Sequence, residues 1–330
     1  MDILFIGGTG NISAACAQLL RQRGHRVALL TRGQTPVPPG YEAITADRTN
    51  PDAMAAALGT RCFDAVVNFI GFDVPDVRLD VELFQGRTRQ YVFISTTVVY
   101  SKPPARLPVV ETDPLGNEFS AYGRKKQACE DYLLERCRRD GFPLTIVRPS
   151  HTYSCHWIPN PVTSVGYTVA ARLERGLPVF VHDDGQGLWT LTASADFALG
   201  LGGLLGQPAA LGEAFQITSD EVLTWNQILA EIALALGVAR PSPVCIPTAF
   251  IGQVEPIMHD KLMGDKAHPG VFDCAKIKRL VPDFECRTSF RAGIRQAVAW
   301  FRADASRRAV NPQIDALFDR VIAAWRQARG

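Results

Sequence analysis

A short apolar run that leads directly into a glycine-rich turn constrains this chain more than any other feature. Ile3 to Ile6 are all apolar, as in a strand buried on both faces of a parallel sheet, and Gly7-Gly8-Thr9-Gly10-Asn11-Ile12-Ser13 follows. Apolar residues then recur at helical spacing from Ile12 to Leu20, and Arg26 to Thr31 begin the next strand. Strand, glycine turn, helix and strand in this order predict a doubly wound α/β fold that binds a dinucleotide.

The glycine turn also indicates which residues would contact that dinucleotide. Glycines let the backbone approach the pyrophosphate, whose charge is stabilised at the N-terminus of the following helix. Ser13 replaces the third glycine of the usual motif, a small departure that still permits close packing of helix on strand. We therefore expect cofactor contacts from the following residues of the turn: Gly7, Thr9, Gly10, Asn11 and Ile12.

The end of the second predicted strand bears on the choice between NAD and NADP. NAD enzymes usually have Asp or Glu there to bind the adenosine 2′-hydroxyl, but this chain has Thr31 and Arg32. A guanidinium is suited to a 2′-phosphate, so NADP is favoured over NAD. Asp47, which ends the next short strand, is a candidate for the adenine edge and equally for a cap or turn.

The alternation of strands and helices continues to about residue 150, the expected end of the dinucleotide-binding domain. Asn68 lies at the carboxyl end of the fourth strand, where the cofactor crevice of such sheets is lined. The ranges predicted for this part are helices over Pro51 to Leu58 and Val77 to Phe84, and strands over Phe63 to Phe69 and Gln90 to Ser95.

A tyrosine and a lysine four residues apart, Tyr122 and Lys126, lie on a predicted helix. Their side chains leave the same helix face, so the lysine can act on whatever the tyrosine contacts. Bringing a tyrosine from its pKa near 10 to about 7 requires roughly 4 kcal/mol, and a neighbouring ammonium is one source of it. Taken alone, such a pair is more often a packed tyrosine and a solvated lysine.

The order of these motifs resembles that of the extended short-chain dehydrogenases/reductases of the NAD-dependent epimerase/dehydratase family. It runs from the glycine turn through Phe93 to Tyr100 and the Tyr122 helix to Arg148-Pro149-Ser150, and the first two-thirds of the chain match best. The resemblance implies that Thr96 and Tyr122 act on the substrate oxygen during hydride transfer at nicotinamide, that Lys126 binds the nicotinamide ribose, and that Pro149 contacts the cofactor. Alternation along the strand places Ser95 and Thr97 on the face opposite Thr96.

Four positions depart from subgroups of that family. Sugar dehydratases carry Asp-Glu directly after the catalytic hydroxyl, where this chain has Thr97 and Val98, so elimination is not expected. Sugar-nucleotide epimerases often have an asparagine near the position of His151, and they have a diphosphate-binding arginine in the place of Trp189. Recognition of a nucleotide diphosphate is therefore doubtful.

Residues 151–330 are expected to form a smaller α/β substrate domain, with some segments returning to the first domain. The segment from His259 to His268 is expected to be a loop at the pocket mouth that could contact an anionic or hydroxylated substrate. Its histidines have no metal-ligand spacing, so we expect no metal site. Candidate substrate contacts are His151, Trp157, Trp189 and His268, and His156 and His182 are further pocket candidates.

Composition places the chain among ordinary globular proteins. A formal charge of +2 over 330 residues gives no general electrostatic reason to bind nucleic acid or membrane. Eight scattered cysteines without C-x-x-C suggest reduced thiols in a cytoplasmic protein. The first apolar run is too short for a signal peptide, and no later stretch reaches ~18 apolar residues.

Three functions follow from these observations. The leading one is epimerisation of a sugar or sugar-like secondary alcohol through a transient ketone. The alternative is an NADP-dependent ketone reductase or alcohol dehydrogenase whose substrate lacks a nucleotide diphosphate, favoured by Arg32 and Trp189. A non-catalytic, cofactor-sensing or RNA-associated protein is the third. Family habit adds a possible homodimer through the helices near 75–86 and 120–138.

Overall fold

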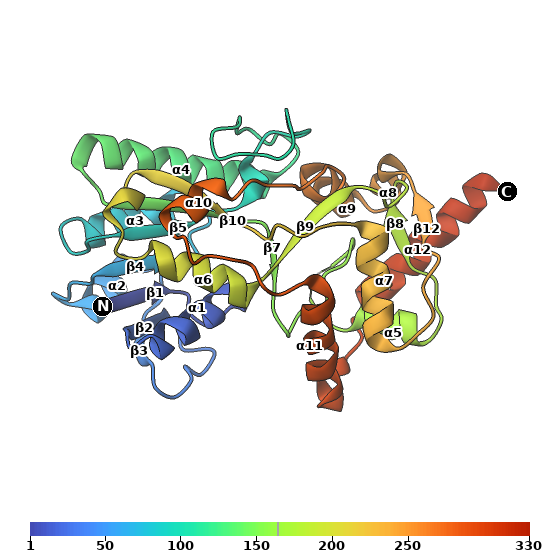
Figure 1. The fold of residues 1–330 in the computed structure, drawn as a ribbon, viewed down its shortest axis with the longest axis horizontal. Coiled ribbons are helices and arrows are strands. Elements are labelled where there is room, and N and C mark those ends of the chain that lie inside the picture. The colour runs from blue at the N-terminus through green and yellow to red at the C-terminus, as the bar shows by residue number, and fades with distance from the viewer. Residues whose placement is uncertain (164) are drawn as a thin grey trace.

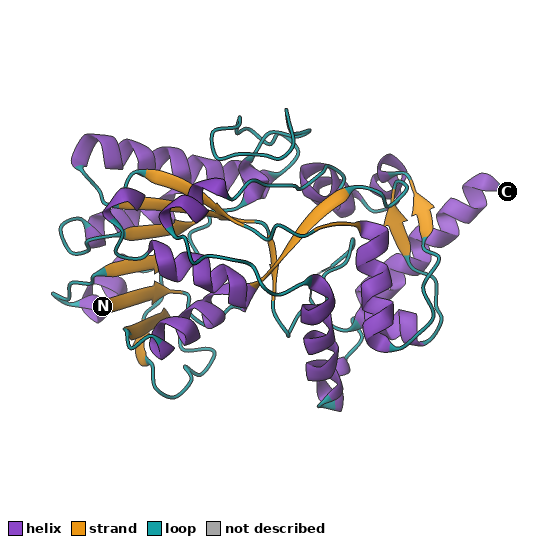
Figure 2. Cartoon of the chain, viewed as in Figure 1, coloured by secondary structure: helices purple, strands orange, loops and turns teal. Residues whose placement is uncertain are grey.

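The chain folds into two lobes that share several chain crossings. We describe it from a computed structural model over residues 1–163 and 165–330. The N-terminus lies in a lobe built on a parallel sheet, and the C-terminus lies at the far end of a smaller α/β lobe (Figure 1). Helices cover both faces of the large sheet, whereas the second lobe is mainly helical (Figure 2).

The large sheet has seven parallel strands in the order β10-β6-β5-β4-β1-β2-β3, which confirms the predicted doubly wound fold. β1 pairs with β2 on one side and β4 on the other, so the strand before the glycine turn is central. The strands are β1 (Asp2–Ile6), β2 (Arg26–Thr31), β3 (Glu42–Thr45), β4 (Ala65–Asn68), β5 (Tyr91–Ile94), β6 (Leu144–Pro149) and β10 (Glu213–Ile217).

Alternate residues of the buried strands pack against different helix layers. Ile3 and Phe5 of β1 belong to the cluster on the face covered by α1 (Asn11–Gln22), α6 (Ser194–Leu204) and α10 (Ala275–Leu280). Leu4 and Ile6 belong to the cluster on the other face, covered by α2 (Pro51–Leu58), α3 (Val74–Phe84) and α4 (Ala121–Asp140). Burial on both faces explains why these strands are continuously apolar rather than alternating.

The boundary between the lobes does not fall at a single residue. α6 packs on α1, and β10 extends the large sheet beside β6, although both come after residue 150. Buried Phe197 and Phe215 from these elements join the core of the large sheet. α6 and β10 lie with the large sheet because their apolar faces complete one side of it.

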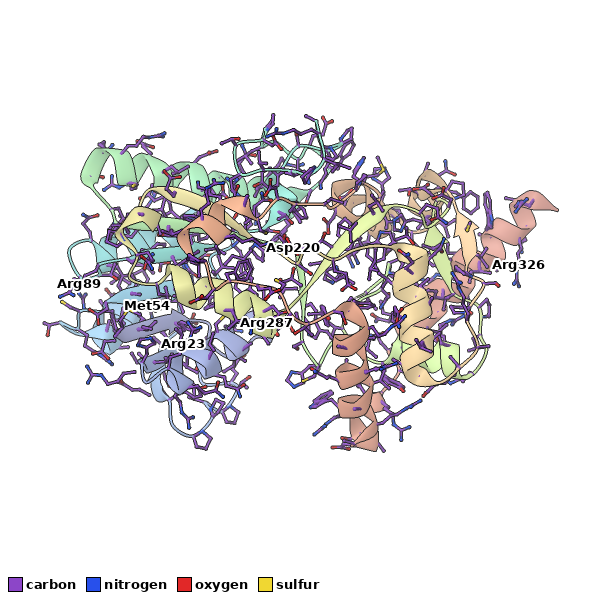
Figure 3. All side chains as sticks on the ribbon, in the orientation of Figure 1. Arg23, Met54, Arg89, Asp220, Arg287 and Arg326 are labelled. Carbon is purple, nitrogen blue, oxygen red and sulfur yellow. The ribbon has the colours of Figure 1, made fainter. Side chains whose placement is uncertain are left out.

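The second lobe has its own core around Trp225. Buried Phe180, Ile294 and Phe318 belong to this core, and side chains fill both lobes, with Met54 in the sheet lobe and Arg326 on the last helix (Figure 3). Its elements are β7 (His151–Tyr153), β8 (Phe180–His182), β9 (Leu188–Ala193), β11 (Val222–Thr224), β12 (Val244–Ile246), α5 (Thr168–Glu174), α7 (Trp225–Leu236), α8 (Thr248–Val254), α9 (Pro256–Lys261), α11 (Phe290–Arg302) and α12 (Pro312–Arg329).

The segment expected to be a loop at the pocket mouth is helical instead. α9 runs directly into a π-helical turn, Leu262–Lys266. Met258 and Leu262 lie four residues apart and are both buried, which gives the segment one apolar face and explains its helical form. π-helical turns occur frequently at functional sites.

Within residues 1–163 and 165–330, no helix is both long and apolar enough to cross a bilayer. In the same ranges, no group of three or more His, Cys, Asp or Glu side chains is arranged to hold a metal ion.

Candidate active site

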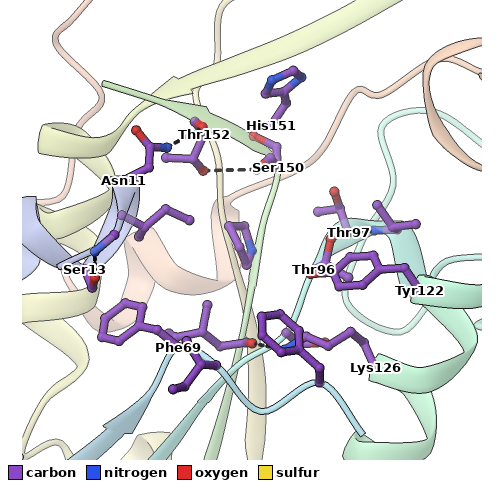
Figure 4. A pocket seen from close by; sticks show the side chains of 18 of the residues that line it. Asn11, Ser13, Phe69, Thr96, Thr97, Tyr122, Lys126, Ser150, His151 and Thr152 are labelled. Carbon is purple, nitrogen blue, oxygen red and sulfur yellow. Dashed lines mark hydrogen bonds between the residues drawn. The ribbon is translucent and has the colours of Figure 1, made fainter. Parts of the chain in front are cut away.

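A cavity of about 660 Å³ lies where the carboxyl ends of the large sheet meet the second lobe. One wall is the glycine turn, and another carries Thr96, Tyr122 and Lys126. His151 and Trp157 line it from the segment that enters the second lobe. Figure 4 shows Tyr122 and Lys126 leaving one helix on the side where Thr96 lies, with Asn11 across the cavity.

The backbone of the glycine turn fits a dinucleotide. Gly7 has φ +83°, and a Cβ there would lie 2.6 Å from the side chain of Ile70, so no other residue fits without strain. Gly10 precedes the first residue of α1, and both line the cavity. The turn therefore presents a helix N-terminus and a side-chain-free floor to any pyrophosphate that enters.

Side chains of the turn hold it against the rest of the site. The Ser13 hydroxyl accepts a hydrogen bond from the Gly10 N–H at 2.9 Å, and the Asn11 amide donates to the Thr152 carbonyl at 2.8 Å. Ser13 thus caps the helix, which explains how a serine replaces the expected third glycine. Thr9 and Ile12, also predicted as cofactor contacts, line the cavity beside them.

Lys126 is almost completely buried, with 1% of its surface exposed. Its ammonium donates to the Gly71 carbonyl at 2.8 Å and the Ile94 carbonyl at 2.6 Å, and lies 4.3 Å from the Phe93 ring centroid. Burial lowers the pKa of Lys126 to about 8. The ammonium is therefore held at the carboxyl ends of β4 and β5, where these strands open into the cavity.

Tyr122 combines an exposed ring with a buried hydroxyl. The residue is 44% exposed, yet burial around its hydroxyl raises its pKa to about 12. A hydrogen bond with Thr96 acts in the opposite direction, and the charge of Asp265 raises the pKa further. Tyr122 thus carries its proton at neutral pH in this state and is bonded to the expected hydroxyl partner.

The other two hydroxyl residues after β5 differ from expectation. Strand geometry ends at Ile94, and Thr97 begins a 3₁₀ turn, Thr97–Val99, so the expected alternation of faces does not continue. As a result both Ser95 and Thr97 line the cavity with Thr96. The Thr96 hydroxyl also accepts a hydrogen bond from the Val98 N–H at 3.2 Å, which fixes the start of the turn.

Three predicted cofactor contacts lie outside this cavity. Asn68 is fully buried, where its amide donates to Asp80 and to the Tyr91 hydroxyl, so it supports the sheet rather than presenting its side chain to the crevice. Arg32 is exposed just after β2. The Asp47 carboxylate accepts hydrogen bonds from the Thr49 N–H and hydroxyl at 2.9 and 2.8 Å. It therefore stabilises a turn, which is one of the two roles expected for it.

Arg32 and Asp47 nevertheless lie at one edge of the sheet. β2 and β3 pair in parallel register and end at Thr31 and Thr45, so the residues that follow leave the same sheet edge. Hydrogen bonds from Thr49 lower the pKa of Asp47, and Arg32 contributes in the same direction. This edge is where the adenosine end of a dinucleotide lies in the doubly wound fold.

The four candidate substrate residues divide into two pairs. His151 and Trp157 line the cavity, and burial lowers the pKa of His151 to about 3, so its imidazole is neutral at pH 7. Trp189 is only 4% exposed and packs 5.2 Å from the Trp225 ring in the core of the second lobe. His268 lies against Phe119 and does not line the cavity, so these last two positions differ from expectation.

Two cavity residues, Asp265 and Lys266, were not assigned individually from the sequence. They belong to the π-helical turn, three and two residues before His268. The charged segment from His259 to His268 is their signal in the sequence, but a loop prediction does not indicate which of its side chains enters the cavity. In the helical turn, the direction of each side chain depends on its position around the axis.

A buried ion pair supports the helix that carries Tyr122. Arg148 of β6 forms a two-pronged bond with Glu130 of α4, at 3.0 and 2.6 Å, and also donates to the Tyr100 hydroxyl at 3.0 Å. Arg148 and Glu130 are both buried. The pair therefore ties α4 to the sheet directly behind the site.

Sequence comparisons identify relatives along most of the chain. The model of the NAD-dependent epimerase/dehydratase family matches residues 3–217. A 2'-dehydrokanamycin reductase from Streptomyces kanamyceticus is 26% identical over 87% of this chain and 81% of its own length. A chloroplast stem-loop binding protein of 41 kDa from Arabidopsis thaliana is 27% identical over 73% of this chain and 65% of its own.

Solved structures share the fold. An epimerase from Methanothermobacter thermautotrophicus superposes with a TM-score of 0.76 at 18% identity, covering 92% of this chain and 93% of that one. A UDP-glucose 4-epimerase from Thermotoga maritima gives 0.72 at 19% identity, covering 92% and 99%. With the family match spanning well over half of the chain, the protein belongs to the NAD-dependent epimerase/dehydratase family and is an enzyme of the extended short-chain dehydrogenase/reductase type that uses a nicotinamide cofactor.

Proposed function

We propose that this protein interconverts a secondary alcohol and a ketone on a neutral, sugar-like small molecule, and that ketone reduction is its main direction. The observation that carries the proposal is the convergence of Thr96, Tyr122 and Lys126 on one wall of a cavity whose opposite wall is the glycine turn. The bound cofactor supplies or accepts the hydride at the reacting carbon. In reduction, the ketone oxygen gains its proton from the Tyr122 hydroxyl.

The protonation states are those that ketone reduction requires. The raised pKa of Tyr122, about 12, keeps its hydroxyl protonated at neutral pH and ready to protonate a carbonyl oxygen. Thr96, which is hydrogen-bonded to Tyr122, can hold the same oxygen. The Lys126 ammonium can hold the nicotinamide ribose and stabilise the tyrosinate after proton transfer. In the reverse direction Tyr122 takes the hydroxyl proton.

The charges of the cavity support a substrate without a diphosphate. Among the described residues that line it, the cationic side chains are Lys126 and Lys266, and Lys126 is bonded to two backbone carbonyls. His151 is neutral at pH 7. Trp189, in the place of the expected arginine, is packed in the core. A diphosphate would thus have few charged partners.

We further propose that NADP is the preferred cofactor. Arg32 lies exposed at the end of β2, and no described residue makes a hydrogen bond with its guanidinium. It is therefore free to bind a 2′-phosphate. Replacing Arg32 by Ala should weaken NADP binding about tenfold or more and leave NAD binding nearly unchanged. Isothermal titration of both cofactors measures this, and equal weakening would contradict the proposal.

The central experiment compares the wild type with Tyr122→Phe. Removing the hydroxyl should lower turnover about 10²- to 10⁴-fold, because general acid catalysis is lost, while cofactor affinity stays within about twofold. A panel of neutral keto-sugars and keto-cyclitols, followed by NADPH absorbance, supplies the assay. Unchanged turnover in Tyr122→Phe would refute the assignment.

Cofactor stoichiometry separates reduction from epimerisation. Epimerisation uses the same residues, and the family description favours it. A reductase consumes one NADPH for each ketone reduced, whereas an epimerase converts substrate with no net change in cofactor. Product analysis by NMR alongside absorbance distinguishes them. Salt-dependent binding of RNA stem-loops, with no turnover of any ketone, would instead favour the RNA-associated alternative.

A further inference from the structure

The π-helical turn Leu262–Lys266 is fixed to the helix that carries Tyr122. The Asn117 amide donates to the Gly264 carbonyl at 2.6 Å and to the Val98 carbonyl at 2.7 Å, so it joins the turn to the segment after Thr96. A Cβ on Gly264 would lie 2.9 Å from the Cβ of Ser120, the N-cap of α4. The turn thus holds a set position beside the reacting groups.

Asp265 is a partly buried residue of this turn that lines the cavity. Burial raises its pKa, and the charges of Lys102 and Lys266 act against that effect. In residues 1–163 and 165–330, no side chain or backbone N–H is recorded as a hydrogen-bond donor to its carboxylate. Its charge also raises the pKa of Tyr122, which places the two groups within electrostatic reach. Its carboxylate oxygens can therefore accept hydrogen bonds from a molecule in the cavity.

Lys266 lines the same cavity with hydrogen-bonding capacity left over. Its ammonium donates to the Asn160 and Pro161 carbonyls at 3.1 and 3.4 Å. An ammonium has three hydrogens, so one is left for a further acceptor. Burial lowers the pKa of Lys266 to about 8, and its charge contributes to the low pKa of His151, which places it near that side chain.

We propose that Asp265 and Lys266 form a subsite for a hydroxyl group of a neutral polyol substrate. The hydroxyl donates to the Asp265 carboxylate and accepts from the Lys266 ammonium, so one substrate group provides a hydrogen-bond partner for both side chains. This inference rests on the proposed function, because it defines the substrate that Tyr122 would act on.

The charged side chains around the subsite have both signs. Lys102, Asp265 and Lys266 sum to +1 when all are charged, and His151 adds no charge at pH 7. A substrate ammonium can only donate and a substrate carboxylate can only accept, so each would satisfy one of Asp265 and Lys266 and bring a like charge to the other. A hydroxyl meets neither repulsion.

The test measures binding rather than turnover, so it does not depend on finding the true substrate. The full-length protein saturated with NADP⁺ is titrated by ligand-observed saturation-transfer NMR. The neutral probes are myo-inositol, D-glucose and D-galactose, and the charged probes are 2-amino-2-deoxy-D-glucose and D-glucuronate. We expect at least one neutral probe to bind about tenfold more tightly than either charged probe.

Asp265→Asn should weaken that neutral probe about tenfold, because a hydrogen bond to a charged acceptor becomes one to a neutral amide. The matched control is Asp260→Asn, which makes the same charge change on an exposed residue of the preceding helix. Lys266→Gln provides a second reading if Asp265→Asn is poorly folded.

Tighter binding of a charged probe, no saturable binding of any neutral probe, or equal effects of Asp265→Asn and Asp260→Asn would each overturn the subsite. Failure of the proposed function looks different. It would leave this selectivity intact while Tyr122→Phe made no difference to turnover.

Discussion

The buried ammonium of Lys126 should make the stability of the protein rise with pH. Its folded-state pKa, about 8, lies below the ordinary value of 10.5. Below about pH 8 the folded protein must keep a charge in a buried site, which opposes folding. As pH rises from 8 towards 10.5, the unfolded chain still binds the proton and the folded chain does not, so the free energy of unfolding increases.

The size of the effect follows from the shift. One pKa unit corresponds to about 1.4 kcal/mol, so the full difference between 10.5 and 8 amounts to about 3 kcal/mol. Between about pH 7 and about pH 9.5, part of that range is covered, and the contribution is about 2 kcal/mol. Lys126→Met removes this contribution. It also removes the bonds to Gly71 and Ile94, but that loss does not change over this pH range.

The assay is urea unfolding of the cofactor-free protein at these two pH values. We expect the wild type to gain about 2 kcal/mol relative to Lys126→Met on going to the higher pH. Lys125→Met is the matched control, since Lys125 is the neighbouring residue of the same helix with a side chain 61% exposed. The free energy of unfolding of Lys125→Met should change between the two pH values by the same amount as that of the wild type. A constant difference between wild type and Lys126→Met would refute the reasoning.

Two further predictions concern stability. Gly7→Ala should lower the free energy of unfolding by about 3 kcal/mol, because it places a Cβ on a residue with positive φ and brings that Cβ within 2.6 Å of Ile70. Gly24→Ala, measured by the same urea unfolding, should lose only about 1 kcal/mol, because φ is +82° there but nothing lies within 4 Å of the added Cβ. Glu130→Gln should lower stability by about 3 kcal/mol, because it leaves the buried guanidinium of Arg148 short of its charged partner. Thermal unfolding of Glu130→Gln is compared with that of Glu135→Gln, a substitution at an exposed position of the same helix. Equal losses of stability in the two variants would contradict the prediction.

The fold of the large sheet could be predicted because each of its elements shows its own signal. Ile3 to Ile6 are buried on both faces, and the positive φ of Gly7 requires a glycine. The strand and the turn are therefore both specified by the residues that form them. The placement of β10 could not be predicted in this way. Nothing in residues 213–217 distinguishes a strand that joins the large sheet from one that joins the small lobe, because strand partners depend on contacts distant in sequence.

The candidate site also contains residues that a local pattern predicts and residues whose position depends on distant contacts. Tyr122 and Lys126 could be paired from spacing on one helix, and their family resemblance added Thr96. The positions of Trp189 and Asp265 could not be predicted. Trp189 packs against Trp225 in the core of the second lobe, and Asp265 lines the cavity because it belongs to a π-helical turn. Both outcomes depend on tertiary packing rather than on local pattern.

The short links between the lobes restrict how the cavity can move. Only Ser150 separates β6 from β7, and β9 ends at Ala193 where α6 begins at Ser194. The Ser150 and Thr192 hydroxyls bond to each other at 2.7 Å, which joins these two links. A hinge would have to bend several such links together, so the lobes are poorly suited to closing around a ligand. Such links favour a site whose shape is set before a substrate binds.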